Sequence, residues 1–232
     1  MSHMKRLLAP KFWRVSKKEN KFIVSPSPGP HPKKTCIPLK VLLRDILNYA
    51  ENSLEVKKIL NEGKVLVDKK PRKDPKFPTG LMDIVEIPDT KQHFRVSVNK
   101  HGLCLEEIDK SKANAKLCKI TGKTIVNGGV TQLNLHDGRN VLVEKDVYKV
   151  GDSVLIGLPD QKIIKHFKFE PGADALIVSG RNKGLKGKVK EIKKRKTMLE
   201  RGVVKIDVKG KEIETAKKYI IVGNPDLKGE AK

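Results

Sequence analysis

The sequence predicts a mainly β protein that contains one small α/β module. Hydrophobic residues make up 38% of the 232 residues and aromatic residues only 4%, so the core must be built from Val, Ile and Leu, which suit small sheets. Apolar residues recur at helical intervals of three and four between residues 38 and 62. From residue 94 onward they alternate with polar residues in short runs separated by turn residues, which is the pattern of hairpins.

Residues 1–36 are expected to form a basic N-terminal arm. They hold nine basic residues, one acid and five prolines, with one short apolar run at Phe22–Val24. Such a segment buries too little apolar surface to offset its ordering entropy, so we expect it to order on its partner. Trp13, the only tryptophan, lies between Lys11 and Arg14. It either stacks on a base or fills a crevice in the protein, and the sequence leaves both alternatives open.

Residues 37–93 are expected to form a module of two helices on a small sheet. Apolar residues recur at helical spacing from Leu39 to Ala50, which predicts the first helix. Asn52, with Glu55 three residues later, predicts the capped start of a second helix that stops at Gly63. Two strands complete the module, over residues 64–67 and 82–87.

A middle β domain is expected over residues 94–169, a second β domain over 170–223 and a tail over 224–232. The strands of the middle domain are predicted at 94–98, 103–108, 124–126, 130–135, 141–143, 154–156 and 163–169. Those of the last domain are predicted at 175–178, 187–192, 203–208, 212–215 and 219–222. Five strands in about 50 residues fit a small SH3-like barrel.

The charge of the chain is strongly positive and is concentrated at both ends. The 50 Lys and Arg against 27 Asp and Glu give a net charge of +23. Residues 1–36 contribute nine basic residues against one acid, and residues 168–232 contribute eighteen against nine. Each Lys or Arg placed on a phosphate releases condensed counterions, so this distribution favours a polyanion, above all nucleic acid, as the partner.

Several other classes of protein lack support in the sequence. No stretch reaches the ~18 apolar residues that span a bilayer, and the N-terminus lacks the apolar core of a secretory signal, so we expect a cytoplasmic protein. The cysteines at 36, 104 and 118 form no CxxC pair, so neither disulfides nor a metal site is expected, although His101 and Cys104 have a ligand-like interval. No nucleophile with a base, paired carboxylates or HExxH motif is found, so no catalytic residue and no cofactor are predicted.

A glycine-rich string over residues 178–189 is the sharpest motif. Glycine permits positive φ and brings backbone amides close to a phosphate, and cations between the glycines supply charge. The glycines are at 180, 184 and 187, and the cations are Arg181, Lys183 and Lys186. The spacing matches neither a nucleotide-binding P-loop nor a Rossmann turn. The string resembles the KOW motif of ribosomal and transcription-elongation proteins; a plain glycine hairpin is the alternative. A further basic run, Lys193–Lys196, lies nearby.

The helix pair and strands over residues 38–87 resemble the alpha-L type RNA-binding module, which is shared by certain ribosomal proteins, tyrosyl-tRNA synthetases and pseudouridine synthases. In that family the paired helices present basic side chains to a structured RNA. The resemblance therefore implies RNA contacts from Lys40, Arg44, Lys57, Lys58, Lys64 and Arg72.

The order of several segments is similar to one family over nearly the whole chain, the archaeal and eukaryotic small-subunit ribosomal protein four, e-type. These segments are Met4–Trp13, Pro26–His31, Pro38–Arg44, Gly80–Val85, Lys149–Ser153 and the glycine-rich string. The resemblance implies an alpha-L module, a central β domain and a C-terminal KOW barrel. The chain ends soon after that barrel, without the long extension of eukaryotic members, so we expect an archaeal source.

The expected function is that of a structural constituent of the small ribosomal subunit, which binds rRNA and other ribosomal proteins but no membrane and no small-molecule substrate. The alternatives are a KOW-containing transcription-elongation factor and an RNA-modifying enzyme. Pseudouridine synthases resemble each other around a Gly-Arg-Leu-Asp string, and the nearest string here, Gly138–Val141, has no acid in place. The residues expected to contact RNA are Lys5, Arg6, Lys11, Trp13, Arg14, His31, Lys40, Arg44, Lys57, Lys58, Lys64, Arg72, Arg181, Lys183, Gly184, Lys186, Lys193, Lys194, Arg195 and Lys196.

Overall fold

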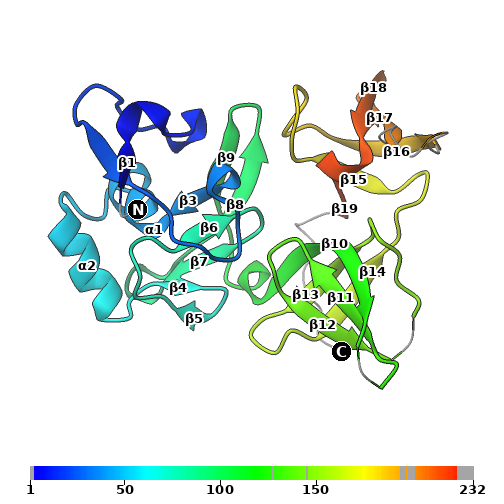
Figure 1. The fold of residues 1–232 in the computed structure, drawn as a ribbon, viewed down its shortest axis with the longest axis horizontal. Coiled ribbons are helices and arrows are strands. Elements are labelled where there is room, and N and C mark those ends of the chain that lie inside the picture. The colour runs from blue at the N-terminus through cyan, green and yellow to red at the C-terminus, as the bar shows by residue number, and fades with distance from the viewer. Residues whose placement is uncertain (1–2, 127, 145, 194–196, 198–201, 224–232) are drawn as a thin grey trace. The chain divides into compact units, whose positions relative to one another are not determined.

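The computed structural model describes residues 3–126, 128–144, 146–193, 197 and 202–223, and it is mainly β, as the sequence predicts (Figure 1). The chain divides into two compact units. The first unit comprises Met1–Ser97 and Leu103–Ala113, and the second comprises Val98–Gly102 and Asn114–Lys232. None of the described helices has the length and apolar character that crossing a bilayer requires.

The main sheet of the first unit has the strand order β5-β4-β7-β8-β9. Its strands are β4 (Leu66–Val67), β5 (Lys70–Pro71), β7 (Ile84–Ile87), β8 (Gln92–Asn99) and β9 (Gly102–Glu107). The sequence places β8 and β9 at the start of a middle domain, but β8 pairs antiparallel with β7. The reason is local: the short turn η5 (Pro88–Thr90) and Lys91, with a φ of 55°, fold the chain straight back.

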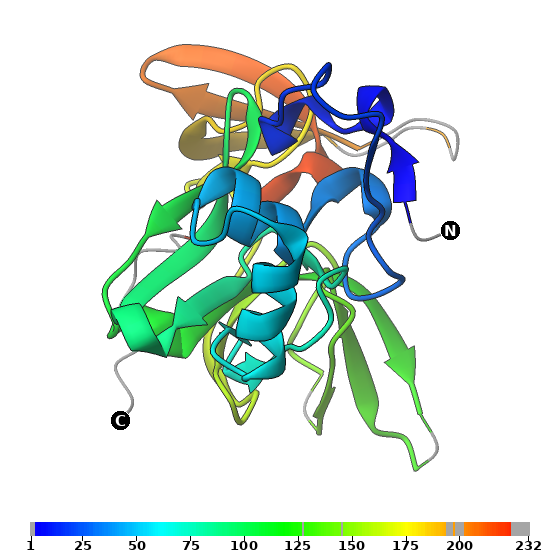
Figure 2. The same cartoon turned by 90° about the vertical axis from the view of Figure 1, so that its left-hand side faces the viewer.

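Two helical segments of the first unit contact one another (Figure 2). The first consists of α1 (Leu39–Val41) and the π-helical turn η4 (Leu42–Ile46), and the second is α2 (Ser53–Asn61). The first stops short of the predicted Ala50, because Asn48 has a left-handed backbone with a φ of 55°. The apolar side chains that these segments bury are Leu39, Val41, Leu42, Leu43, Val56 and Leu60.

The second helix begins and ends as predicted. The side-chain oxygen of Asn52 accepts hydrogen bonds from the backbone N–H groups of Leu54 and Glu55, at 2.9 and 3.1 Å. The carboxylate of Glu55 in turn accepts the N–H of Glu51, so three backbone donors at the start of the helix are satisfied. Gly63 follows the last turn with a φ of 74°, the left-handed conformation that ends many helices.

The N-terminal arm is folded within the first unit. Strand β1 (His3–Lys5) pairs with β2 (Phe22–Val24), with the 3-10 turns η1 (Arg6–Leu8) and η2 (Lys11–Trp13) between them. After η3 (Lys33–Thr35), strand β3 (Cys36–Pro38) pairs with β6 (Pro78–Gly80). The structure shows the arm packed within the first unit, and its ordering on a partner stays a prediction. The arm needs no core of its own, because Trp13 and Ile23 are buried within the first unit.

The first sheet of the second unit has the order β12-β11-β10-β13-β14. Its strands are β10 (Ala115–Ile125), β11 (Thr131–Leu135), β12 (Asn140–Val143), β13 (Ser153–Gly157) and β14 (Ile163–Phe167), preceded by η6 (Lys112–Asn114). The sequence predicts each strand except most of β10, of which it finds only the end. β10 pairs with β13 through its first half and with β11 through its second half, with a register shift between Ile120 and Gly122.

The second sheet of this unit has the order β18-β17-β16-β15-β19. Its strands are β15 (Asp174–Ile177), β16 (Lys186–Lys193), β17 (Val203–Val208), β18 (Lys211–Ala216) and β19 (Ile220–Val222), with η7 (Lys217–Tyr219) before the last. All five agree with the predicted strands to within a few residues. They enclose a core of small aliphatic side chains, namely Ala175, Ile177, Val189, Val204, Ile206, Val208, Ile220 and Val222.

Candidate nucleic-acid interface

Lys40, Arg44 and Lys57 form a cluster of like charges on the two helical segments, here called the helical cation cluster. Burial, followed by the charges of Arg44 and Lys57, lowers the pKa of the Lys40 ammonium. The nearby acid, Asp45, is held by the Arg44 guanidinium, whose contacts with the two carboxylate oxygens measure 3.0 and 2.9 Å. Three cations thus share one acid. An anion such as a phosphate would relieve their mutual repulsion.

Other basic residues of this module differ in how far acids compensate their charge. Lys64 Nζ lies 2.9 Å from the carboxylate of Glu62 and 3.4 Å from that of Asp89, and both acids raise the pKa of Lys64. Lys58 is exposed and forms no ion pair with any residue that the structure describes. Of these two lysines, Lys58 is therefore better able to take up a phosphate.

Arg72 is anchored by packing. Its guanidinium carbon lies 4.4 Å from the centroid of the Phe77 ring, a cation–π arrangement. Its Nε is buried and finds no hydrogen-bond acceptor in the described part of the chain. The ring fixes the position of the guanidinium group and leaves its charge without a carboxylate partner among the described residues.

The six arm residues that were expected to contact RNA fall into two groups. Three are exposed: Lys5, Lys11 and Arg14. Three are buried, with exposed fractions of 4%, 0% and 6%: Arg6, Trp13 and His31. The second group therefore offers almost no surface to a partner, so the predicted RNA contacts of these three residues do not fit their burial.

The buried arm residues have partners within the first unit. Trp13 Nε1 donates a 2.8 Å hydrogen bond to the carbonyl oxygen of Cys36, so the indole fills a crevice in the protein, the second of the two alternatives. His31 Nε2 lies 3.0 Å from a carboxylate oxygen of Asp83, and both side chains are buried. These contacts give the residues a structural role, in which they hold the arm on the module.

The glycine-rich string forms the turn between β15 and β16. Gly180 and Gly184 have φ values of 90° and 85°, as a phosphate-approaching or tightly turned loop requires. Arg181 and Lys186 are exposed and Lys183 is half-buried. Of the nearby basic run, Lys193 is described and pairs with Glu214 at 2.7 Å, whereas Lys194, Arg195 and Lys196 lie outside the described residues.

Three lysines on the sheet next to this loop are compensated by acids on other strands of the same sheet. They form the pairs Lys190–Glu212, Lys193–Glu214 and Lys205–Glu191. Hydrogen bonds and charges within these pairs raise the pKa values of Lys190 and Lys205 and lower those of Glu212 and Glu214. This compensation was not predicted, although the period-two spacing of Glu212 and Glu214 on a predicted strand is a signal for it.

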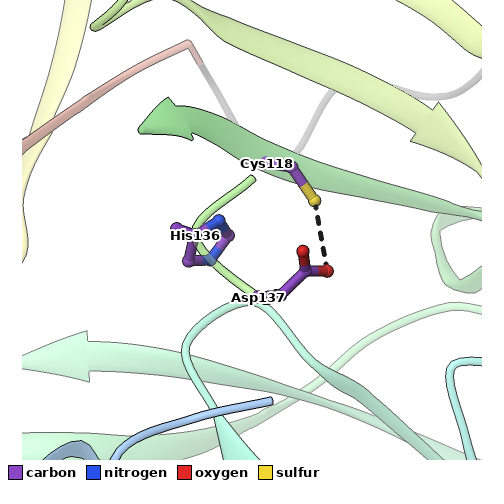
Figure 3. A group of neighbouring side chains, drawn as sticks. All are labelled: Cys118, His136 and Asp137. Carbon is purple, nitrogen blue, oxygen red and sulfur yellow. Dashed lines mark hydrogen bonds between the residues drawn. The ribbon is translucent and has the colours of Figure 1, made fainter. Parts of the chain in front are cut away.

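Cys118, His136 and Asp137 form a compact group in the second unit (Figure 3). One ligand atom of each lies within 4.8 Å of the others. His136 Nδ1 accepts the backbone N–H of Lys119 at 3.2 Å, and the Cys118 thiol points to an Asp137 oxygen at 3.6 Å. The same oxygen lies 2.8 Å from the ammonium of Lys116, and both of these side chains are buried.

The charge balance of this group favours an ion pair over a bound metal. Burial acts to raise the pKa of Asp137, but Lys116, with smaller contributions from His136 and Arg139, outweighs it, so that the pKa is lowered. A divalent ion placed among the three side chains would meet that ammonium at its carboxylate ligand. His101 and Cys104, which have a ligand-like interval in sequence, are not part of the three-residue group found among the described residues. Asp137 also accepts the N–H of Arg139, as a turn-forming aspartate does.

Comparisons with known proteins agree on one family. The Ribosomal family S4e matches residues 90–163, and the RS4NT (NUC023) domain matches residues 2–34. The small ribosomal subunit protein eS4 of Methanothermobacter thermautotrophicus is 44% identical over 225 residues, which cover 97% of this chain and 93% of that protein. The eS4 protein of Methanococcus aeolicus is 41% identical over 234 residues, with coverage of 97% and 94%.

A solved structure shows the same architecture. The crystal structure of the 30S ribosomal protein S4e from Thermoplasma acidophilum aligns with a TM-score of 0.70 at 30% identity, over 81% of this chain and 94% of that chain. The mainly β fold with few helices is common to both. Identity above 40% along almost the full length of both sequences confirms the resemblance seen in the ordered segments. The chain belongs to the family of small ribosomal subunit protein eS4.

Proposed function

We propose that this chain is a structural constituent of the small ribosomal subunit and that it binds rRNA. The helical cation cluster is the observation that carries the proposal, because its three cations share a single acid, and burial together with the charges of Arg44 and Lys57 lowers the pKa of Lys40. A cluster of this kind is costly in isolation and becomes favourable when phosphates approach it. Membership of the eS4 family supports the same function.

Each unit contributes basic residues to RNA binding in this proposal. In the first unit, the helix pair with Lys40, Arg44, Lys57 and Lys58 acts as an alpha-L module. In the second unit, the sheet of β15–β19 acts as a KOW barrel that presents Arg181, Lys183 and Lys186. Double-helical RNA hides its base edges in a deep groove, so phosphate contacts supply the affinity and the shape of the folded RNA supplies the selection.

The alternative functions have weaker support. A transcription-elongation factor would account for the glycine-rich string but not for the helix pair, and no relative named above is such a factor. An RNA-modifying enzyme would need a catalytic carboxylate at the Gly138–Val141 string. Asp137, which precedes that string, is held in the ion pair with Lys116. We therefore propose a non-enzymatic role in the cytoplasm, within the ribosome and in contact with other ribosomal proteins.

A salt series on the intact protein tests the proposal. Binding to a small-subunit rRNA fragment is measured from low to moderate salt, and neutralisation of about eight phosphates predicts a log–log slope of about −6. A slope near zero would contradict phosphate binding. Co-sedimentation with small subunits after a stringent salt wash is the second arm of the test, and exclusive association with RNA polymerase would support the elongation-factor alternative.

A pair of matched variants tests the helical cation cluster itself. The double substitution K40A/K57A is expected to reduce the magnitude of the slope by about 1.5, since two phosphate contacts are lost. The control is K64A on the same module, because Lys64 already pairs with Glu62 and Asp89. Equal effects of the two variants would mean that local pairing does not decide which lysines bind RNA.

A further inference from the structure

The backbone of Gly184 lies directly against the turn that joins β8 to β9. A Cβ placed on Gly184 would be 2.6 Å from the carbonyl carbon of Asn99, 2.7 Å from its Cα and 2.9 Å from the backbone nitrogen of Lys100. Asn99 and Lys100 lie in the short stretch Val98–Gly102, which belongs to the second unit together with Gly184. No side chain fits at this distance, so the glycine at 184 is required by the approach of two backbones as well as by its φ of 85°.

Each of the two segments is braced by its own hydrogen bonds. Gly184 donates its N–H to the carbonyl oxygen of Ile177 at 2.7 Å, which closes the glycine-rich loop at its base. In the other segment the side-chain oxygen of Asn99 accepts the N–H of His101 at 2.9 Å, and Gly102 completes the turn with a φ of 127°. The contact therefore joins two ordered turns.

The exposed side chains on these two turns include several basic ones. Lys100 and His101 are exposed at the tip of the turn, and Arg181 is exposed on the glycine-rich loop. Lys100 and Arg181 form no ion pair with any residue in the described ranges. The residues from 99 to 102 and from 179 to 187 include no acid. The two turns thus place uncompensated cations from distant parts of the sequence around one backbone contact.

We propose that the β8–β9 turn is part of the RNA-binding surface, with Lys100 binding a phosphate of the same RNA backbone that the glycine-rich loop contacts. The inference rests on the proposed function and deepens it, because it assigns a binding role to a turn for which neither the motifs nor the resemblance gave one. The ligand is the sugar–phosphate backbone, since a lysine is a point charge that carries no base-specific hydrogen-bond pattern. Gly184 acts as a positioning residue that allows the turn to reach the loop.

The test compares K100A with K91A in the full chain. Lys91 is exposed and adjoins the opposite end of the same strand, β8, so it is a matched control. K100A is expected to weaken binding to the rRNA fragment about fivefold and to reduce the magnitude of the salt slope by about 0.8, whereas K91A leaves both unchanged. K100A binding with wild-type affinity and slope would overturn the proposal and leave the turn as a mechanical support.

Two further measurements separate this inference from the proposed function. In a G184A background the backbone contact is opened, so the effect of K100A is expected to shrink to less than twofold; a full fivefold effect would show that Lys100 acts independently of the loop. Acylation of Lys100, followed by mass spectrometry, is expected to slow when RNA is bound, and unchanged acylation would also overturn the inference. Failure of the wild-type protein to bind the fragment would instead defeat the proposed function.

Discussion

Lys119 Nζ donates a 2.7 Å hydrogen bond to the carbonyl oxygen of Ile220. The same ammonium also reaches the carbonyl oxygens of Lys217 and Lys218, at 3.1 and 3.0 Å. One side chain of β10 therefore satisfies three backbone acceptors in and after η7, where the chain enters β19. Ser153 on β13 adds a further link, because its hydroxyl oxygen accepts the N–H of Val222 at 3.2 Å. The two sheets of the second unit are joined by these polar contacts.

Substitution of Lys119 by Met is expected to lower the free energy of unfolding by about 2–4 kcal/mol, because three carbonyl oxygens lose their donor. Urea denaturation followed by circular dichroism measures the change. The control is Lys162→Met, an exposed lysine in the turn between β13 and β14. Equal stability of the two variants would show that water replaces the ammonium at no cost.

The pH dependence of unfolding provides a second test of Lys119. Burial, with a smaller contribution from Lys217, lowers the pKa of Lys119 from 10.5 to about 8 in the folded protein. Between these values the unfolded chain binds the proton and the folded chain does not, so the contribution of Lys119 to the free energy of unfolding increases as pH rises through this window. At pH 9 unfolding is expected to take up about one more proton in the wild type than in Lys119→Met. Identical pH slopes for the two proteins would contradict the shift.

The buried pair of Lys116 and Asp137 predicts a strong asymmetry between single and double substitutions. Asp137→Asn leaves the Lys116 ammonium buried without its carboxylate, which is expected to cost about 3–5 kcal/mol of stability. Replacing both residues, as in K116M/D137N, removes the uncompensated charge and is expected to recover most of that loss. Thermal and urea unfolding of D137N, K116M and the double variant measure the cycle. A double variant as unstable as Asp137→Asn would show that the pair does not act as a unit.

Trp13 supplies an intrinsic probe of the arm. It is the only tryptophan and is fully buried, so its fluorescence is expected to resist quenching by acrylamide and to stay unchanged when the rRNA fragment binds. Unfolding exposes the indole and is expected to shift the emission to longer wavelength. Quenching on addition of RNA to the folded protein would restore the base-stacking alternative.

Features that the local sequence determines could be predicted. The cap at Asn52, the stop at Gly63 and the five strands of the last sheet depend on neighbouring residues, and the structure reproduces them. Strand β10 was missed because Lys116 and Lys119 interrupt its apolar pattern, although both are drawn inward by partners distant in sequence. The burial of the arm was missed for the same reason. Trp13 is buried by a contact with Cys36, 23 residues away, which no local pattern reveals.

The candidate site was predictable in composition but not in detail. The helical cation cluster follows from helical spacing, which places Lys40 and Arg44 one turn apart. The pairing of each lysine with an acid depends on the tertiary fold, because the partners of Lys64 and Lys205 come from other elements. The contact between Gly184 and Asn99 joins residues 85 positions apart, so the sequence alone could only suggest a loop glycine.

The ion pairs between β16, β17 and β18 have a consequence for orientation. Lys190, Lys193 and Lys205 add to the formal charge of the chain. Each forms an ion pair with a glutamate and therefore attracts a polyanion only weakly. These pairs weaken the attraction of this part of the sheet for a polyanion, whereas Arg181 on the loop at its end has no ion-pair partner among the described residues. A protein whose whole surface is basic would bind in many orientations. Neutralised surface beside a basic loop reduces the number of orientations in which the protein binds a folded nucleic acid during assembly.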